Sequence, residues 1–136
     1  MDAQPVLLDT DILSAIMRSD SRATAEARRY LNVQGRFSFS VITRYEVLRG
    51  LLAKGATQQS AAFERLCSAS EVLPVTDAIA HRAARIYADL RNQGRLIGDA
   101  DILIGATALV HGYAVASNNA AHLARIHGLP VENWLR

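Results

Sequence analysis

The sequence predicts an α/β fold, a three-layer α/β/α sandwich with a mainly parallel central sheet. Short apolar runs of strand length alternate along the chain with longer segments of helical periodicity. Strands that alternate with helices imply crossover connections, and these build a parallel sheet covered by helices on both faces. Half of the 136 residues are hydrophobic, which is enough to form a core. We therefore expect one domain over residues 1–136.

The first strand is predicted at Val6–Leu8, an apolar run of the kind that parallel sheets bury on both faces. It leads directly into Asp9, which would lie at the carboxyl end of the strand, where open α/β sheets bind their ligands. Thr10 or Asp11 is expected to cap the following helix, because both side chains accept hydrogen bonds from free helix N–H groups. From these residues alone, Asp9 and Asp11 could equally be turn and capping residues or part of a ligand site.

Helical spacing predicts a short helix over 12–17 and a longer one over 22–34, which has one apolar stripe. Polar and aromatic residues alternate over 36–40, which is typical of a short strand. A helix over 41–54 follows. The inner face of that helix is predicted from its apolar spacing, at Tyr45, Leu48 and Leu52.

The second half of the chain repeats this alternation. A helix is predicted over 57–70, a strand over 71–75 that Pro74 brings to an end or an edge, and a long helix capped by Thr76. The helix over 99–111 is apolar nearly all round, so we expect it to be buried on more than one side. The remaining elements are a strand over 113–116, a turn at 117–119, a short helix through about 125, and a final edge strand over 128–132.

Polar side chains should gather at the carboxyl edge of this sheet. Asp9 ends the first strand, Asp101 lies in the first turn of the apolar helix, and Asn119 follows the next buried strand. Glu46 is a charge within an otherwise packed helix. Acids buried this close together are costly without a cation. An all-oxygen set suits Mg²⁺, with Mn²⁺ as a substitute, and a bound Mg²⁺ supplies the chemistry of a metal-dependent nuclease.

Each of these residues also has a purely structural explanation. Asp101 could serve only as a helix cap, and Asn119 only as a turn residue. Glu46 could be a surface acid paired with Arg49 or Arg44. The histidines show no spacing typical of metal ligands and are interpreted as ordinary residues, at His81, His111, His122 and His127.

The positive charge is almost entirely arginine, with Lys54 as the sole lysine. Arginine suits phosphate recognition, but a net charge of +2 is too small to establish a polyanionic partner. Cys67 is the single cysteine, which excludes an intrachain disulfide and a thiolate metal cluster. The sequence shows neither a signal peptide nor a stretch long enough to span a membrane. We expect a cytoplasmic protein without a membrane partner.

Segments in a fixed order carry a resemblance to a known family. They are 7–11 (LLDTD), 40–50 (from Ser40 through Thr43, Arg44, Tyr45 and Glu46 to Gly50), 97–108 (IGDADILIGATA), 115–119 (VASNN) and 132–134 (ENW). In these segments the chain resembles PIN-domain ribonucleases, and among them the VapC-type toxins of bacterial toxin–antitoxin pairs. The resemblance implies a parallel-sheet sandwich, in agreement with the pattern of elements.

The resemblance also implies a function and a site. The acids of the family fall on Asp9, Glu46 and Asp101, and its frequent fourth acid falls on Asn119. The implied activity is that of a Mg²⁺-dependent endoribonuclease, often acting on structured RNA such as tRNA. Such proteins are often held inactive by a cognate antitoxin and commonly form homodimers. The metal ligands would be Asp9 and Asp101, with Glu46 binding directly or through water.

Other residues are expected to support this site. Asp11, Ser117 and Thr43 would lie behind the acids, and the residues expected to hold RNA phosphates are Arg44, Arg49 and Arg95. The chain departs from the family at Asp11, where asparagine is usual, and at Asn119, where an acid is usual, so a second metal site would be weak or absent. Ser117 replaces a usual threonine and keeps the hydroxyl.

Two other functions fit parts of the pattern. The pair Asp9 and Asp11 resembles the aspartates of haloacid-dehalogenase-type phosphatases, in which Asp9 would be the nucleophile and Lys54 the only lysine able to neutralise the phosphate. A non-catalytic PIN-like binding module would dock a partner without cutting RNA. The presence of Asp9, Glu46 and Asp101 together argues against that module.

Overall fold

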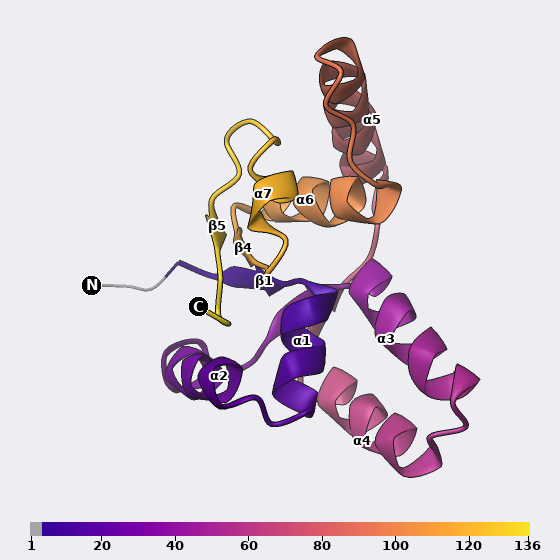
Figure 1. Cartoon of the computed structure of the whole chain (residues 1–136), viewed down its shortest axis with the longest axis vertical. Helices are drawn as coiled ribbons and strands as arrows, with labels where there is room; N and C mark the ends of the chain where they lie inside the picture. Colours follow the sequence, from indigo (N-terminus) through magenta and orange to yellow (C-terminus); the bar gives the residue numbers. More distant parts are fainter. Residues whose placement is uncertain (1–3) are drawn as a thin grey trace.

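A single five-stranded sheet organises the computed structural model, which describes residues 4–136. All strand pairs are parallel, in the order β3-β2-β1-β4-β5. The strands are β1 (Val6–Leu8), β2 (Ser38–Ser40), β3 (Glu71–Leu73), β4 (Ala114–Ala116) and β5 (Val131–Glu132). Helices cover both faces of the sheet, so the predicted three-layer α/β/α sandwich is confirmed (Figure 1).

The helices divide into two groups (Figure 1). On one side of the sheet lie α1 (Thr10–Met17), α2 (Ser21–Gln34), α3 (Val41–Ala53) and α4 (Thr57–Ser68). On the other side lie α5 (Asp77–Asn92), α6 (Asp99–His111) and the single-turn α7 (Ala120–Leu123). Within the part of the chain that the structure describes, no helix combines the length and the apolar character needed to cross a membrane.

The central strand β1 shows why the sheet needs both layers. Successive side chains of a strand point to opposite faces. Leu7 accordingly packs into the core formed with α5 and α6, whereas Val6 and Leu8 pack into the core formed with α1 to α4. All three side chains are buried. Burying each one stabilises the fold by roughly 1.5–3 kcal/mol, so a continuous apolar run is what this position requires.

The sheet topology predicts a ligand site at the carboxyl end of β1. This strand pairs with β2 on one side and β4 on the other, so the chain order reverses around it. In open α/β sheets, ligands bind where the strand order reverses in this way. The backbone ladder continues beyond the strand ends, because Asp9 N donates to Ala116 O and Ser117 N donates to Glu132 O, each at 2.9 Å.

Several predicted boundaries differ from the structure by a few residues. The strands predicted over 36–40, 71–75 and 128–132 are shorter, and the helix after the 117–119 turn ends at Leu123. Thr76 caps α5 as predicted, since its hydroxyl accepts a hydrogen bond from Ile79 N at 3.2 Å. The cap of α1 is Asp9, and the prediction of Thr10 or Asp11 was wrong.

The predicted inner face of α3 was also largely wrong. Tyr45 and Leu52 are 58% and 63% exposed. The buried residues of this helix are Thr43 and Val47, while Leu48 packs partly buried against the core. Apolar residues occur on two stripes of α3, so spacing alone does not identify the stripe that faces the sheet.

Candidate active site

The carboxylate of Asp9 is fixed between two neighbouring strand ends. It is the N-cap of α1, where Oδ1 accepts a 2.8 Å hydrogen bond from Thr10 N. Its Oδ2 accepts a 2.7 Å hydrogen bond from the hydroxyl of Ser117, which follows β4 and is fully buried. Asp9 itself is only 6% exposed. Burial raises the pKa of Asp9 to about 6, although the two hydrogen bonds oppose the shift.

Asp11 lies at the same edge of the sheet as Asp9. Its Oδ2 accepts a 3.0 Å hydrogen bond from Asn118 N, in the turn after β4. Its Oδ1 is buried and has no hydrogen-bond partner among the described residues. Burial raises the pKa of this carboxyl group, and the charge of Asp101 raises it further. An unpartnered buried carboxylate oxygen is costly and is the type of atom that a cation or an ordered water satisfies.

Asp101 and Asn119 lie close together, as the sequence predicted from their positions at the carboxyl edge of the sheet. The amide Nδ2 of Asn119 donates to Asp101 Oδ2 at 3.2 Å and lies 3.0 Å from His122 Nδ1. Asn119 also donates its backbone N–H to the hydroxyl of Ser117 at 2.8 Å. Asn119 is therefore more than a turn residue, because it links Asp101 to the residue that holds Asp9.

Glu46 reaches this edge from α3. Its Oε1 accepts a 2.6 Å hydrogen bond from the Thr10 hydroxyl, and its side chain is 22% exposed. Thr43 lies behind this contact, with its hydroxyl 3.5 Å from both the Thr10 hydroxyl and Leu8 O. The first residue of α1 thus holds Glu46 close to this edge of the sheet. Glu46 also lies 4.0 Å from Arg49, so the predicted ion pair and the predicted site coexist.

The acids influence one another electrostatically. The charges of Asp11 and Asp101 raise the pKa of Asp9, after the larger effect of burial. The pKa of Asp101 is raised mainly by burial and also by the charge of Glu46, while His122 opposes the shift. Asp9, Asp11 and Asp101 are therefore each harder to ionise than an exposed aspartate, mainly because of burial.

The donor set fits a hard divalent cation that keeps part of its water. Within residues 4–136, no three acidic, histidine or cysteine side chains are grouped closely enough to bind one ion together. Mg²⁺ is commonly held by only one or two carboxylates, with waters completing an octahedral shell. Asp9 and Asp101, which influence each other electrostatically, are the two carboxylates that could hold such an ion, and Glu46 could act through water. The unpartnered oxygen of Asp11 is a further observation in favour of a cation here.

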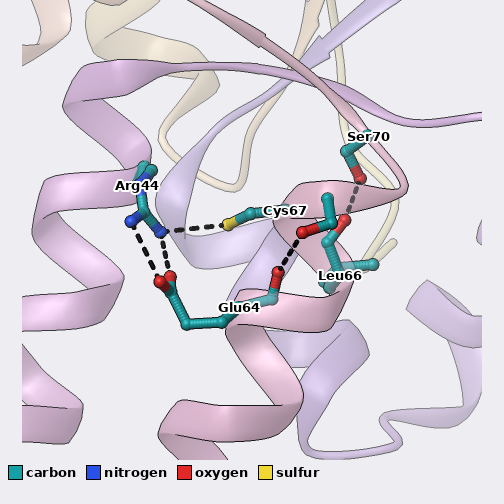
Figure 2. Close-up of polar contacts among 6 residues, drawn as sticks. Arg44, Glu64, Leu66, Cys67 and Ser70 are labelled. Atoms are coloured by element: carbon teal, nitrogen blue, oxygen red, sulfur yellow. Dashed lines mark hydrogen bonds and ion pairs between the residues drawn. The ribbon is translucent and has the colours of Figure 1, made fainter.

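The three predicted phosphate-binding arginines have different surroundings. Arg49 lies next to Glu46 on α3 and is exposed. Arg44 instead forms an ion pair with Glu64 on α4 and donates a 3.4 Å hydrogen bond to the sulfur of Cys67, as Figure 2 shows. Arg95 is exposed in the loop before α6, where its carbonyl accepts from Arg125. The structure thus brings only Arg49 into contact with a candidate acid.

Two residues of this region were missed by the sequence reasoning. Thr10 was treated as a cap, although its hydroxyl binds Glu46. His122 was interpreted as ordinary, although it contacts Asn119. A signal existed for His122, because it lies three residues after Asn119 at the start of a short helix. No comparable signal existed for Thr10, because its contact depends on how α3 packs against α1.

Comparisons with known proteins agree with this architecture. Residues 6–129 match the PIN domain family. The tRNA(fMet)-specific endonuclease VapC of Shigella flexneri is 30% identical over 129 residues, which cover 94% of this chain and 96% of that protein. The DNA-bound VapBC structure from Salmonella typhimurium has a chain with 26% identity and a TM-score of 0.84, covering 97% of this chain and 99% of its own.

A further solved structure supports the fold alone. The VapBC2 complex of Rickettsia felis, bound to a DNA fragment from its promoter, contains a chain that is 21% identical and has a TM-score of 0.86. The match covers 95% of this chain and 98% of that chain. With residues 6–129 matched to the PIN domain and a VapC relative similar over nearly its whole length, the chain belongs to the PIN-domain family and, within it, to the VapC group.

Proposed function

We propose that residues 1–136 form one nuclease domain that cleaves RNA in the cytoplasm as the toxin of a toxin–antitoxin pair. The observation that carries the proposal is the environment of Asp9. Its carboxylate is buried, fixed by two hydrogen bonds and surrounded by further acids. A fold that needed only a cap at this position would gain nothing from Asp11 and Asp101 nearby, because their charges make ionisation of Asp9 less favourable.

The proposed cofactor is Mg²⁺, with Mn²⁺ as a substitute. When bound, such an ion activates water and stabilises negative charge on a phosphate oxygen. Asp9 and Asp101 would be its protein ligands, and Glu46 would orient the attacking water or bind directly. Ser117 and Thr10 keep two of these acids in place through their hydroxyl groups. Asn119 donates to Asp101 and so restrains the orientation of that carboxylate.

The proposed substrate is RNA, and tRNA is the first class to test, because the Shigella flexneri relative is named a tRNA(fMet)-specific endonuclease. Of the three arginines predicted to bind phosphate, Arg49 is the one that contacts a candidate acid, Glu46. Arg95 and Arg44 remain predictions, and Arg44 would have to leave Glu64 to bind a phosphate.

A cognate antitoxin is the proposed protein partner, by analogy with the VapBC complex of Salmonella typhimurium. Helices α1, α3 and α4 enclose a groove of about 490 Å³. Its lining is more apolar than polar and includes Met17, Val47 and Leu51, and Glu46 also lines it. An antitoxin segment bound here would lie against Glu46 and exclude RNA. We also propose that two copies of the chain form a homodimer.

The phosphatase alternative has less support. It needs a lysine near the phosphate held by Asp9. Lys54 follows the last residue of α3, about two turns beyond Glu46, whereas the acids gather near the start of that helix. The other alternative, a non-catalytic binding module, is distinguished from the nuclease by the RNA cleavage assay described next.

RNA cleavage by the purified protein tests the proposal, with Mg²⁺ and with EDTA. The key variant is Asp101→Asn, and Asp99→Asn is the matched control because it lies in the same helical turn and is exposed. We expect cleavage by the parent and by Asp99→Asn with Mg²⁺ only, and a loss of at least about 100-fold in Asp101→Asn. If antitoxin-free protein cuts neither tRNA nor any other RNA, the nuclease proposal fails.

A further inference from the structure

Tyr45 occupies an unusual position next to the candidate site. It precedes Glu46 on α3, and the residue is 58% exposed although helical spacing predicted it to be buried. A single exposed aromatic side chain is common on protein surfaces and means little alone. Here, however, the ring is also engaged by a neighbouring cation. The guanidinium carbon of Arg49 lies over the ring, 5.1 Å from its centre.

Arg49 connects this ring to the acid. It lies four residues after Tyr45 and three after Glu46, the spacings at which helical side chains are neighbours. Its Nη2 is 4.0 Å from Glu46 Oε2, while its guanidinium covers one face of the Tyr45 ring. The aromatic ring and the candidate catalytic carboxylate therefore share one arginine. Tyr45 is 58% exposed, so its ring is accessible to a ligand.

The chemistry of these three groups fits a nucleotide. Single-stranded RNA is recognised by stacking of its unpaired bases on aromatic side chains, and arginine binds the attached phosphates. We propose that Tyr45 is a stacking platform for an RNA base adjacent to the cleaved phosphodiester, with Arg49 holding the ring and the phosphate. This inference rests on the proposed ribonuclease function.

The test measures RNA binding in a protein that cannot cut. The probe is a short single-stranded oligoadenylate, and its dissociation constant is measured for the Asp9→Asn protein over a series of salt concentrations. Into this background we introduce Tyr45→Ala, Tyr45→Phe, Arg49→Ala and, as the control, Tyr87→Ala. Tyr87 is 43% exposed on α5, on the other side of the sheet. It is a tyrosine of comparable exposure away from the acids.

Stacking and charge give different signatures in this experiment. Tyr45→Ala should weaken binding about 5- to 100-fold at every salt concentration without changing the salt dependence, because a base stacked on a ring releases no counterions. Tyr45→Phe keeps the stacking face and should bind within about twofold of the background protein. Arg49→Ala should reduce the slope of log K against log salt by about 0.7, the value for one phosphate contact to a single strand. Tyr87→Ala should change nothing.

Three results would overturn the inference. Equal affinity of Tyr45→Ala and its background protein would show that no base stacks there. A loss of affinity in Tyr45→Phe equal to that in Tyr45→Ala would assign the effect to the hydroxyl group. A change in sedimentation of Tyr45→Ala would show that the ring belongs to a protein interface. If the Asp9→Asn protein bound neither oligoadenylate nor tRNA, the proposed function would fail, and this inference with it.

Discussion

The Ser117 hydroxyl donates a 2.7 Å hydrogen bond to the Asp9 carboxylate and thereby joins the ends of β4 and β1. Both residues are buried, and the same hydroxyl accepts the backbone N–H of Asn119. One side chain therefore orients the candidate metal ligand and the turn that carries Asn119. Two changes at these residues test this arrangement without any assumption about the RNA target.

Ser117→Ala should lower the free energy of unfolding by about 1–3 kcal/mol, because a buried carboxylate and a backbone N–H both lose a partner. Urea denaturation at neutral pH measures the change. Ser117→Thr keeps the hydroxyl and should recover most of the loss. Ser68→Ala is a suitable control, since its exposed hydroxyl donates to the carbonyl of Glu64, and it should cost less than about 0.5 kcal/mol. Similar losses in both alanine variants would contradict a special role for Ser117.

The pH dependence of stability should reveal the buried charge of Asp9. Its pKa is about 6 in the folded protein and 3.8 as the ordinary value. Between these values the folded protein binds more protons than the unfolded chain, so stability falls as pH rises from about 4 to 6. Above pH 6 the metal-free protein carries a penalty of up to about 3 kcal/mol, from 1.36 kcal/mol per pKa unit.

Asp9→Asn removes this penalty while keeping a side chain of the same shape. In EDTA at pH 8 we expect the variant to be more stable than the parent by up to about 3 kcal/mol, and the two to converge near pH 4. Asp99→Asn, at an exposed position, should follow the parent curve. If the stability of the parent in EDTA is constant from pH 4 to 8, the pKa of Asp9 is not raised by burial.

The sequence predicted those parts of the site that strand order determines. Asp9 and the 117–119 turn follow apolar runs, and parallel strands bring their carboxyl ends to one edge, so their proximity followed from the topology. Asp101 was predicted for the same reason, as the start of a helix that leads into β4. The roles of Asp9 and Asp101 as metal ligands remain predictions that the proposed experiments test.

The contacts made by α3 could not be predicted in this way. Its apolar residues form two stripes, and the choice between them depends on how the helix packs on β1 and α1. In the observed packing the buried hydroxyl of Thr43 lies near Leu8 O, Glu46 contacts Thr10, and Tyr45 is exposed. Periodicity contains no information about such a contact, because it joins residues distant in sequence.

Thr10 should act as a positioning residue for Glu46. Thr10→Val keeps the shape of the side chain but leaves the 2.6 Å hydrogen bond unmade. Hydrogen bonds to charged groups contribute about 1.5–3 kcal/mol, so we expect kcat to fall about 10- to 100-fold with little change in KM. Thr10→Ser should restore most of the rate. A Thr10→Val enzyme with a changed KM and an unchanged kcat would assign the hydroxyl to substrate binding instead.

Mg²⁺ should stabilise the folded protein by mass action if the acids hold it. An ion that binds the folded state alone raises the free energy of unfolding by about 2.7 kcal/mol at a concentration 100 times its dissociation constant. Thermal unfolding with and without Mg²⁺ measures this in the absence of any RNA. Asp101→Asn should lose the response and Asp99→Asn should keep it, because only Asp101 contacts Asn119 and influences Asp9. An equal response in both variants would place the ion elsewhere, and no response in the parent would favour a binding module without a metal centre.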